Sequence, residues 1–330
     1  MRAVWKGVAC SVLAAAVACS GTSTKQDGFA SGDAGNLLGG GSGGGSGGSG
    51  GSSGASSSGS FGDAGGSGSS SGGNGCSGQA ADYVYVLSAE NDLYSFAPNK
   101  KLFTKIGPLG CTTALSPNSM AVDRNATAYV NYVAADDSTG QIFQVSTTDA
   151  SCTGPLLTLP SGWERLGMGY STNNAGSTAE TLYVAGVGAG AGSSIGLGLI
   201  DFGIKTVGPI GPFSGSLKGQ NAELTGTGDG RLYGFFTTAP VEVAQITKTN
   251  GSTQAPVPMT GVPVPNDWAF SFWGGHFYLY TSAGQGAGGG SNVTDYDPVA
   301  GTVNTMFMTA IGFDIVGAGV STCAPTTTPQ

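Results

Sequence analysis

One two-strand unit recurs five times along the chain, and this repeat restricts the fold more than any other feature. Its clearest copy is Glu223–Phe236, in which a short strand, a Gly-Asp-Gly turn and a second strand beginning at Arg231 follow one another. Turn residues of this kind between two apolar runs predict a β-hairpin. A tyrosine marks the second strand of every copy: Tyr85, Tyr129, Tyr183, Tyr233 and Tyr278.

The spacing of these tyrosines, roughly 45 to 55 residues, is the period of a β-propeller blade built from four short strands. The first copy begins at Tyr83 with no inner strand before it, whereas one strand, Gly312–Val320, is left over after the fifth copy. Pairing of these two ends would complete the first blade and leave no open sheet edge. We therefore predict an all-β fold, a five-bladed β-propeller closed by pairing of the N- and C-terminal strands. A β-sandwich with a similar number of strands is the alternative.

The N-terminus has the composition of an export signal. Two basic residues precede the apolar run Val8–Val17, which is too short for a permanent membrane span. The run ends in Ala16-Val-Ala-Cys19, which is similar to the site where a bacterial signal peptidase cuts before a lipidated cysteine, although Ala16 replaces the usual large aliphatic residue. We predict a lipoprotein signal peptide at residues 1–19 and lipidation of Cys19; an ordinary secretory signal is the alternative. Ser20, in place of an inner-membrane retention signal, favours the outer membrane, with the domain facing the periplasm or the cell surface.

Residues 20–75 are predicted to form a disordered tether. From Gly39 to Gly75, 32 of the 37 residues are Gly or Ser, and such a stretch has no apolar face to bury. A coil of this length spans roughly 40 Å on average, which would hold a folded domain clear of the membrane surface. The propeller domain itself is predicted to occupy residues 76–330.

Four cysteines remain after the lipidation site, and an even number in an exported domain predicts disulfides. Four cysteines allow three pairings. Cys76 and Cys323 flank the two chain ends that must meet, so a bond between them would clasp the ring. Cys111 and Cys152 could then join neighbouring blades. With no Cys-x-x-Cys spacing and His276 as the only histidine, we expect no zinc site, no other metal and no cofactor.

The folded part of the chain is acidic. Residues 77–330 carry 17 acidic and 9 basic side chains, and the whole chain has a net charge of −8. The absence of a basic patch argues against a nucleic-acid partner. A net negative charge keeps a protein soluble, which is the simplest interpretation of the acidity; an attraction for cations is the alternative.

Polar residues stand where the inner strands of the predicted blades begin. Inner strands line the central channel of a propeller, and a channel mouth is a common place for a ligand. Asn118, Ser119 and Asn221 occupy such positions. The alternative to ligand binding is that these residues are polar only because the loops at strand starts are exposed to solvent. Six further residues at these positions form the candidate ligand-binding set: Glu164, Arg165, Glu223, Asp267, Trp268 and Asp314.

Three functions are compatible with such a mouth. A glycoside hydrolase needs two carboxylates that face each other across the bond to be cut, and Glu223, Asp267 and Asp314 are the candidates. The inner strands are rich in Gly, Ala, Met and Phe, which argues against a catalytic site, so we assign no catalytic residue. We predict a non-catalytic binding or interaction module of the cell envelope, attached to the membrane through its lipid and binding a protein or a carbohydrate. A purely structural envelope protein is the remaining alternative.

Several motifs resemble those of an uncharacterised family of myxobacterial lipoproteins with a β-propeller domain. They are Ser119–Arg124, Glu223–Asp229, Phe272–Gly275 and Ile315–Pro325. The resemblance covers roughly residues 77–325 and implies a location in the cell envelope, but no activity. More loosely, the blade pattern is similar to NHL- and YncE-like propellers, which implies binding of proteins or ligands.

Overall fold

Strands account for most of the protein that the structure describes, a computed structural model covering residues 75–77, 80–188, 192–284 and 288–329. The predicted signal peptide, the lipidation site Cys19 and nearly all of the predicted tether lie outside the described residues. Within them, the helical segments are two single 3₁₀ turns, Pro98–Lys100 and Gly215–Leu217. No helix among these residues is long and apolar enough to cross a membrane.

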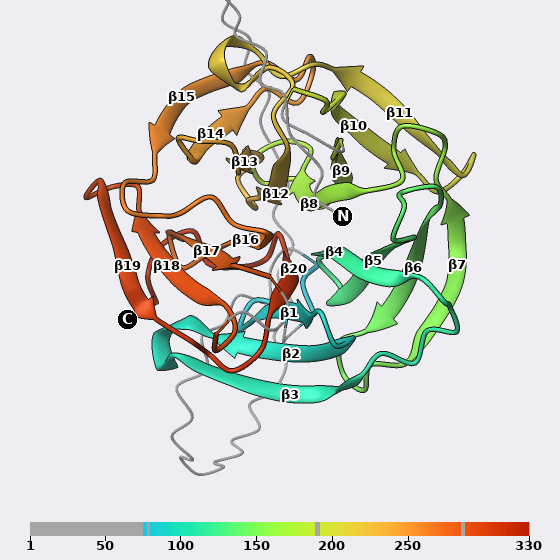
Figure 1. Ribbon diagram of the computed structural model, residues 1–330, viewed down its shortest axis with the longest axis horizontal. Coiled ribbons are helices and arrows are strands. Elements are labelled where there is room, and N and C mark those ends of the chain that lie inside the picture. Colours follow the sequence, from blue (N-terminus) through green and yellow to red (C-terminus); the bar gives the residue numbers. More distant parts are fainter. Residues whose placement is uncertain (1–74, 78–79, 189–191, 285–287, 330) are drawn as a thin grey trace, which may run out of the picture. The chain divides into compact units, whose positions relative to one another are not determined.

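Five antiparallel sheets of four strands form the blades of a propeller, as predicted (Figure 1). Blade 1 joins the two ends of the domain, and blades 2 to 5 follow the chain in order. From the centre outward the strands of blade 1 are β20 (Ile315–Val320), β1 (Val84–Ser88), β2 (Asp92–Ala97) and β3 (Leu102–Pro108); of blade 2, β4 (Ser116–Val122), β5 (Thr127–Val133), β6 (Gly140–Ser146) and β7 (Cys152–Thr158); of blade 3, β8 (Leu166–Thr172), β9 (Glu180–Gly186), β10 (Gly196–Asp201) and β11 (Thr206–Gly211); of blade 4, β12 (Ala222–Gly226), β13 (Leu232–Phe236), β14 (Glu242–Ile246) and β15 (Thr253–Pro258); and of blade 5, β16 (Asp267–Trp273), β17 (His276–Ser282), β18 (Asn292–Asp297) and β19 (Thr302–Met308).

The hydrophobic core is divided among the junctions between blades. Five clusters of buried side chains are present, and each combines residues from two adjacent blades. The marker tyrosines take part in this packing. The ring of Tyr233 in blade 4, for example, lies 4.7 Å from that of Phe277 in blade 5. Both faces of a blade are therefore buried, which explains why the inner and second strands are apolar on both sides.

Neighbouring inner strands approach each other closely at glycines. A Cβ atom on Gly167 of β8 would lie 2.0 Å from the carbonyl oxygen of Ala222 in β12, and one on Gly317 of β20 would lie 2.9 Å from the amide nitrogen of Met120 in β4. Only glycine fits at such contacts. The Gly-rich inner strands thus allow the five blades to meet around a narrow centre (Figure 1).

The ring is closed in the predicted way. β1 pairs antiparallel with β20, with Val84 opposite Val320 and Leu87 opposite Gly317. This pairing supplies the inner strand that the first blade lacks in the sequence. It also rules out the β-sandwich alternative, because the sheets are arranged in a ring rather than as two stacked layers.

Both disulfides form with the expected partners. Cys76 is bonded to Cys323, so that the segment before the first strand is joined to the segment after the last. Cys111, which follows β3 of blade 1, is bonded to Cys152 at the start of β7 in blade 2. The second bond therefore joins neighbouring blades.

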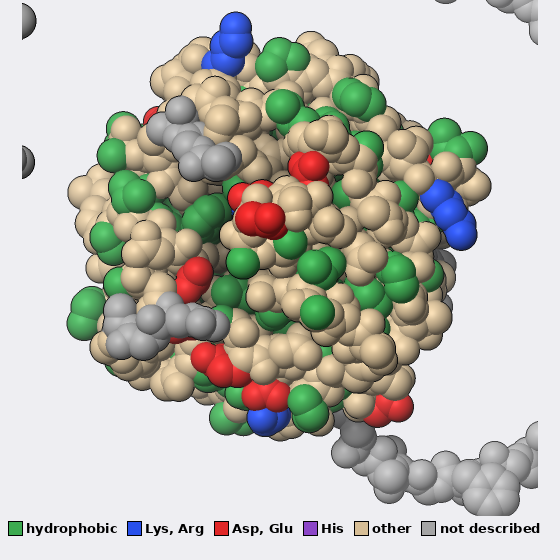
Figure 2. Space-filling view, turned by 45° about the vertical axis from the view of Figure 1, so that its right-hand side comes forward, with side chains coloured by type: hydrophobic (Ala, Val, Ile, Leu, Met, Phe, Trp, Pro, Cys, Tyr) green, Lys and Arg blue, Asp and Glu red, His purple; other side chains and the backbone are tan. Residues whose placement is uncertain are grey.

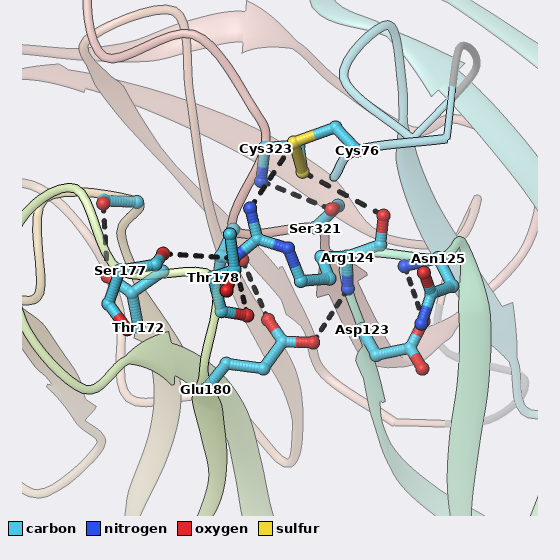
Figure 3. Close-up of a disulfide and its surroundings, with 12 residues drawn as sticks. Cys76, Asp123, Arg124, Asn125, Thr172, Ser177, Thr178, Glu180, Ser321 and Cys323 are labelled. Atoms are coloured by element: carbon cyan, nitrogen blue, oxygen red, sulfur yellow. Dashed lines mark hydrogen bonds between the residues drawn. A yellow bond between two sulfur atoms is a disulfide. The ribbon is translucent and has the colours of Figure 1, made fainter. Parts of the chain in front are cut away.

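Three blades are tied together beside the Cys76–Cys323 bond (Figure 3). The guanidinium group of Arg124, in the β4–β5 turn, donates hydrogen bonds to the carbonyl oxygens of Ser177 and Thr178 in blade 3. The carboxylate of Glu180 accepts from the backbone N–H of Arg124 at 2.8 Å and from the hydroxyl of Thr322 at 2.7 Å. Burial raises the pKa of Glu180. At this end of the inner strands, blades 1, 2 and 3 are therefore joined by hydrogen bonds.

Candidate functional site

A hollow of about 720 Å³ lies at the other end, where the inner strands begin. We call it the mouth hollow and define it by its lining residues. Every blade contributes: Pro117 and Asn118 come from β4, Leu166 from β8, Glu223 from β12, Asp267 and Trp268 from β16, and Val316 from β20, while connecting segments supply Asp137, Arg165, Val187, Gly188, Asn221, Thr237, Thr238, Ala239, Val264, Pro265 and Asn266.

Four of the six predicted binding residues line this hollow: Arg165, Glu223, Asp267 and Trp268. Asp314 is not among the lining residues. Glu164 does not line the hollow either, since its carboxylate turns to the preceding loop and accepts the backbone N–H of Gly162 at 2.8 Å. Its carboxylate thus caps a loop at the rim of the domain.

Arg165 is held in place by two partners. Its Nε donates to Oδ1 of Asp137 at 2.9 Å, and its Nη1 donates to Oδ1 of Asn118 at 2.5 Å. The amide of Asn118 donates in turn to Oδ1 of Asn131 at 2.9 Å and to the carbonyl oxygen of Leu166 at 2.7 Å. The positive charge of Arg165 is thereby compensated by Asp137.

Glu223 lies at the floor of the hollow rather than on its rim. The residue is 2% exposed, and its Oε1 accepts the hydroxyl of Ser119 from β4 at 2.5 Å and the backbone N–H of Met168 from β8 at 3.0 Å. Burial raises the pKa of Glu223 to about 8, although these hydrogen bonds act in the opposite direction. The carboxyl group is therefore mostly protonated at neutral pH.

Asp267 and Asp314 form an acidic pair on the side of blades 5 and 1. Asp267 begins β16 and is half-buried; burial raises its pKa first, and the charge of Asp314 raises it further. Within the part of the chain that the structure describes, the one hydrogen bond to the Asp267 carboxylate from another side chain is long, 3.5 Å from the hydroxyl of Ser282. Asp314 is 5% exposed, and its Oδ1 has no hydrogen-bond partner among the described residues.

Trp268 follows Asp267 on β16 and has two environments. One part of the side chain packs against the cluster between blades 4 and 5, and another part lines the hollow. An indole ring in this position offers an apolar surface on which a sugar ring or a cation can rest.

Sequence reasoning missed the residues that come from the loops after the second strands of the blades. Asp137 lies between β5 and β6, and Gly188 and Thr237 follow β9 and β13. Because strands alternate in direction within a blade, the loop after the second strand returns to the end at which the inner strand begins. Polar residues in these loops, such as Asp137, could have been assigned to the mouth by this argument.

The surface around the domain is acidic rather than basic. Figure 2 shows acidic side chains spread over one face, with Lys and Arg side chains near its edge. Among the described residues, no group of three or more His, Cys, Asp or Glu side chains is arranged to hold a metal ion.

No protein-family model and no curated protein matches this sequence. Among solved structures, the chain is similar to a protein of unknown function from Bacteroides caccae (14% identity, 67% of this chain and 70% of that chain covered, TM-score 0.36). It is similar to another such protein from Bacteroides thetaiotaomicron (14%, 68% and 58% covered, TM-score 0.42) and to a gluconolactonase from Xanthomonas campestris (11%, 60% and 68% covered, TM-score 0.38). Similarities at this level concern the arrangement of strands and carry no conclusion about a ligand or an activity of this protein.

Proposed function

We propose that this protein is a cell-envelope lipoprotein whose propeller binds a small polar ligand in the mouth hollow without catalysing a reaction on it. The observation that carries the proposal is the hollow itself. Its volume of about 720 Å³ is in the range of small-molecule sites. Charged, amide and aromatic side chains from separate blades converge on it, which is the composition that orients a polar ligand.

The positions of the carboxyl groups favour binding over glycoside hydrolysis. A glycosidase requires two carboxyl groups that both reach the bond to be cut. Glu223 is 2% exposed and bonded to Ser119, and Asp314 is 5% exposed. Asp267 is the most accessible of the three candidates, and a single accessible carboxylate supports recognition better than acid–base catalysis.

Full-length protein and its Trp268→Ala variant would be applied to a glycan array and to a set of short peptides. We expect a subset of compounds to bind the wild-type protein and to lose at least tenfold in affinity with Trp268→Ala. Asp201→Asn, which changes an exposed residue at the far end of β10, is the control and should bind normally. If compounds bind but Trp268→Ala has no effect, the ligand site lies elsewhere and the proposal fails. Hydrolysis of a bound glycan would instead favour the glycosidase.

Two features support the location in the cell envelope. The two disulfides are typical of an oxidising compartment outside the cytosol, and the sequence of residues 1–19 predicts lipidation at Cys19. The resemblance to myxobacterial lipoproteins points the same way. In cells, Cys19→Ala should move the full-length protein from the membrane fraction to the soluble fraction. An unchanged distribution would contradict lipid anchoring.

A further inference from the structure

The mouth hollow carries negative charge that the protein does not neutralise. Arg165 is the one basic side chain that lines it among the described residues, and this guanidinium is already paired with Asp137 at 2.9 Å. Asp267 has no cationic partner within ion-pair distance among the described residues, and its nearest side-chain donor is the Ser282 hydroxyl at 3.5 Å. At Asp267 the negative potential of Asp314 exceeds the positive potential of Arg165, and Glu90 adds further negative potential.

Asp314 is a second and independent sign of a missing partner. The residue is 95% buried, yet its Oδ1 accepts no hydrogen bond within the described residues. A buried carboxylate oxygen without a partner is costly, so native proteins rarely retain one. Asp314 immediately precedes β20, the inner strand of blade 1. The charge of Asp314 raises the pKa of Asp267, which lines the hollow, so the two carboxylates are neighbours.

We propose that the mouth hollow recognises a primary ammonium group, held by the carboxylate of Asp267, beside the negative charge of Asp314, and against the indole ring of Trp268. This inference rests on the proposed function and names the chemistry of its ligand. An ammonium group has three N–H donors and a full positive charge, which suits the carboxylate of Asp267, with no cationic partner among the described residues, and the neighbouring charge of Asp314. The ring of Trp268 adds a cation–π contact.

A divalent metal fits these residues less well. Calcium takes six to eight oxygen ligands, and magnesium requires a regular octahedron. The pair Asp267 and Asp314 provides two carboxylates, and no third acidic, histidine or cysteine side chain completes a metal site among the described residues. An ammonium group needs only three hydrogen-bond acceptors and is therefore the better match.

The test compares two amines with their N-acetylated, uncharged forms in full-length protein. The pairs are glucosamine with N-acetylglucosamine, and the peptide amide Gly-Phe-NH₂ with acetyl-Gly-Phe-NH₂. Binding is followed at pH 7 through the indole N–H resonance of Trp268, assigned with Trp268→Phe. We expect at least one amine to shift this resonance and its acetylated form to bind at least tenfold more weakly. The pair that responds tells whether the ammonium belongs to a sugar or to a peptide.

Two isosteric variants locate the contact. Asp267→Asn and Asp314→Asn should each weaken amine binding at least tenfold, whereas Asp201→Asn should leave it unchanged. Asp267 is half-buried at a strand start, so its variant remains informative even if Asp314→Asn does not fold.

The possible outcomes separate the two proposals. If the acetylated forms bind as well as the amines, the ammonium inference is wrong while ligand binding at the mouth stands. If calcium chloride alone shifts the Trp268 resonance and Asp267→Asn abolishes that shift, the site is a metal site and the inference is overturned. If none of the four compounds shifts the resonance, the inference fails, and the array experiment decides separately whether the mouth binds any ligand.

Discussion

At the scale of single residues, Glu223 has an environment unlike that of an ordinary surface carboxylate. It lies at the floor of the mouth hollow and is held by the hydroxyl of Ser119 and the N–H of Met168. Both partners are donors to Oε1. The other charged residues that line the hollow are Asp137, Arg165 and Asp267, and the positive member is paired with Asp137. Burial therefore dominates, and the neutral form of Glu223 is favoured.

This preference predicts a pH-dependent stability. The pKa of Glu223 is about 8 in the folded protein and near 4.5 when the chain is unfolded. Between these values the folded state keeps a proton that the unfolded state releases, so the free energy of unfolding falls as pH rises, by at most about 1.4 kcal/mol per pH unit. The contribution is complete below pH 4.5 and lost above pH 8. Glu223→Gln cannot ionise and should lose this part of the slope.

Urea unfolding of both proteins at several values between pH 5 and pH 8.5 measures the difference. Asp267 also has a raised pKa, but it is present in both proteins and cancels in the comparison. Asp201→Asn is the control and should show the wild-type slope. Equal slopes in wild-type protein and Glu223→Gln would mean that Glu223 is ionised in the folded state.

Residue types at the mouth could be predicted from the sequence, but their burial could not. Arg165, Asp267 and Trp268 stand at inner-strand starts and do line the hollow. Whether Glu223 is exposed depends on Ser119 and Met168, which come from two other blades and are distant in sequence. The sequence pattern around Glu223 carries no information about contacts with other blades.

At the scale of elements, hairpins with short turns were predicted well. The aromatic alternation of Trp268–Trp273 and the turn Gly274-Gly275 mark β16 and β17 almost to the residue. Both signals are local: side-chain alternation sets the strand, and the glycines, with φ of 65° and 87°, permit the turn.

The outer strand of blade 4 was the element that the sequence did not reveal. β15 runs from Thr253 to Pro258 with half-exposed and exposed side chains, and two of its six residues are prolines. Such a strand has neither an apolar alternation nor a full set of N–H donors. It forms because the outer edge of β14 is available for pairing, and because proline is tolerated on the outermost strand of a sheet. Tertiary context, rather than local preference, decides this strand.

At the scale of the whole molecule, closure of the ring could be inferred from counting strands. The repeat has one strand too few in the first blade and one strand too many after the fifth. The simplest arrangement pairs these two ends, and β1 does pair with β20. The same logic identified Cys76 and Cys323 as partners, because they flank the strands that must meet. Location in the cell envelope and lipidation remain predictions.

The two disulfides should differ in their contribution to stability. Cys76–Cys323 spans 247 residues of sequence and Cys111–Cys152 spans 41. In the chain-entropy model a larger loop restricts the unfolded chain more, with contributions of roughly 5.5 and 4 kcal/mol respectively. The longer bond also closes the ring beside Arg124 and Glu180, which join blades 2 and 3. We expect the double variant Cys76→Ser/Cys323→Ser to lose more stability than Cys111→Ser/Cys152→Ser.

Urea unfolding of the two double variants, under non-reducing conditions, gives the ranking. Far-ultraviolet circular dichroism should remain that of a β-protein in both, because the β1–β20 ladder still closes the ring without the bond. A greater loss in Cys111→Ser/Cys152→Ser would show that the junction of blades 1 and 2, rather than the junction of the chain ends, is the weakest point of the ring. Loss of the folded state in Cys76→Ser/Cys323→Ser alone would show that strand pairing is too weak to keep the ring closed, so that the covalent bond is what completes the propeller.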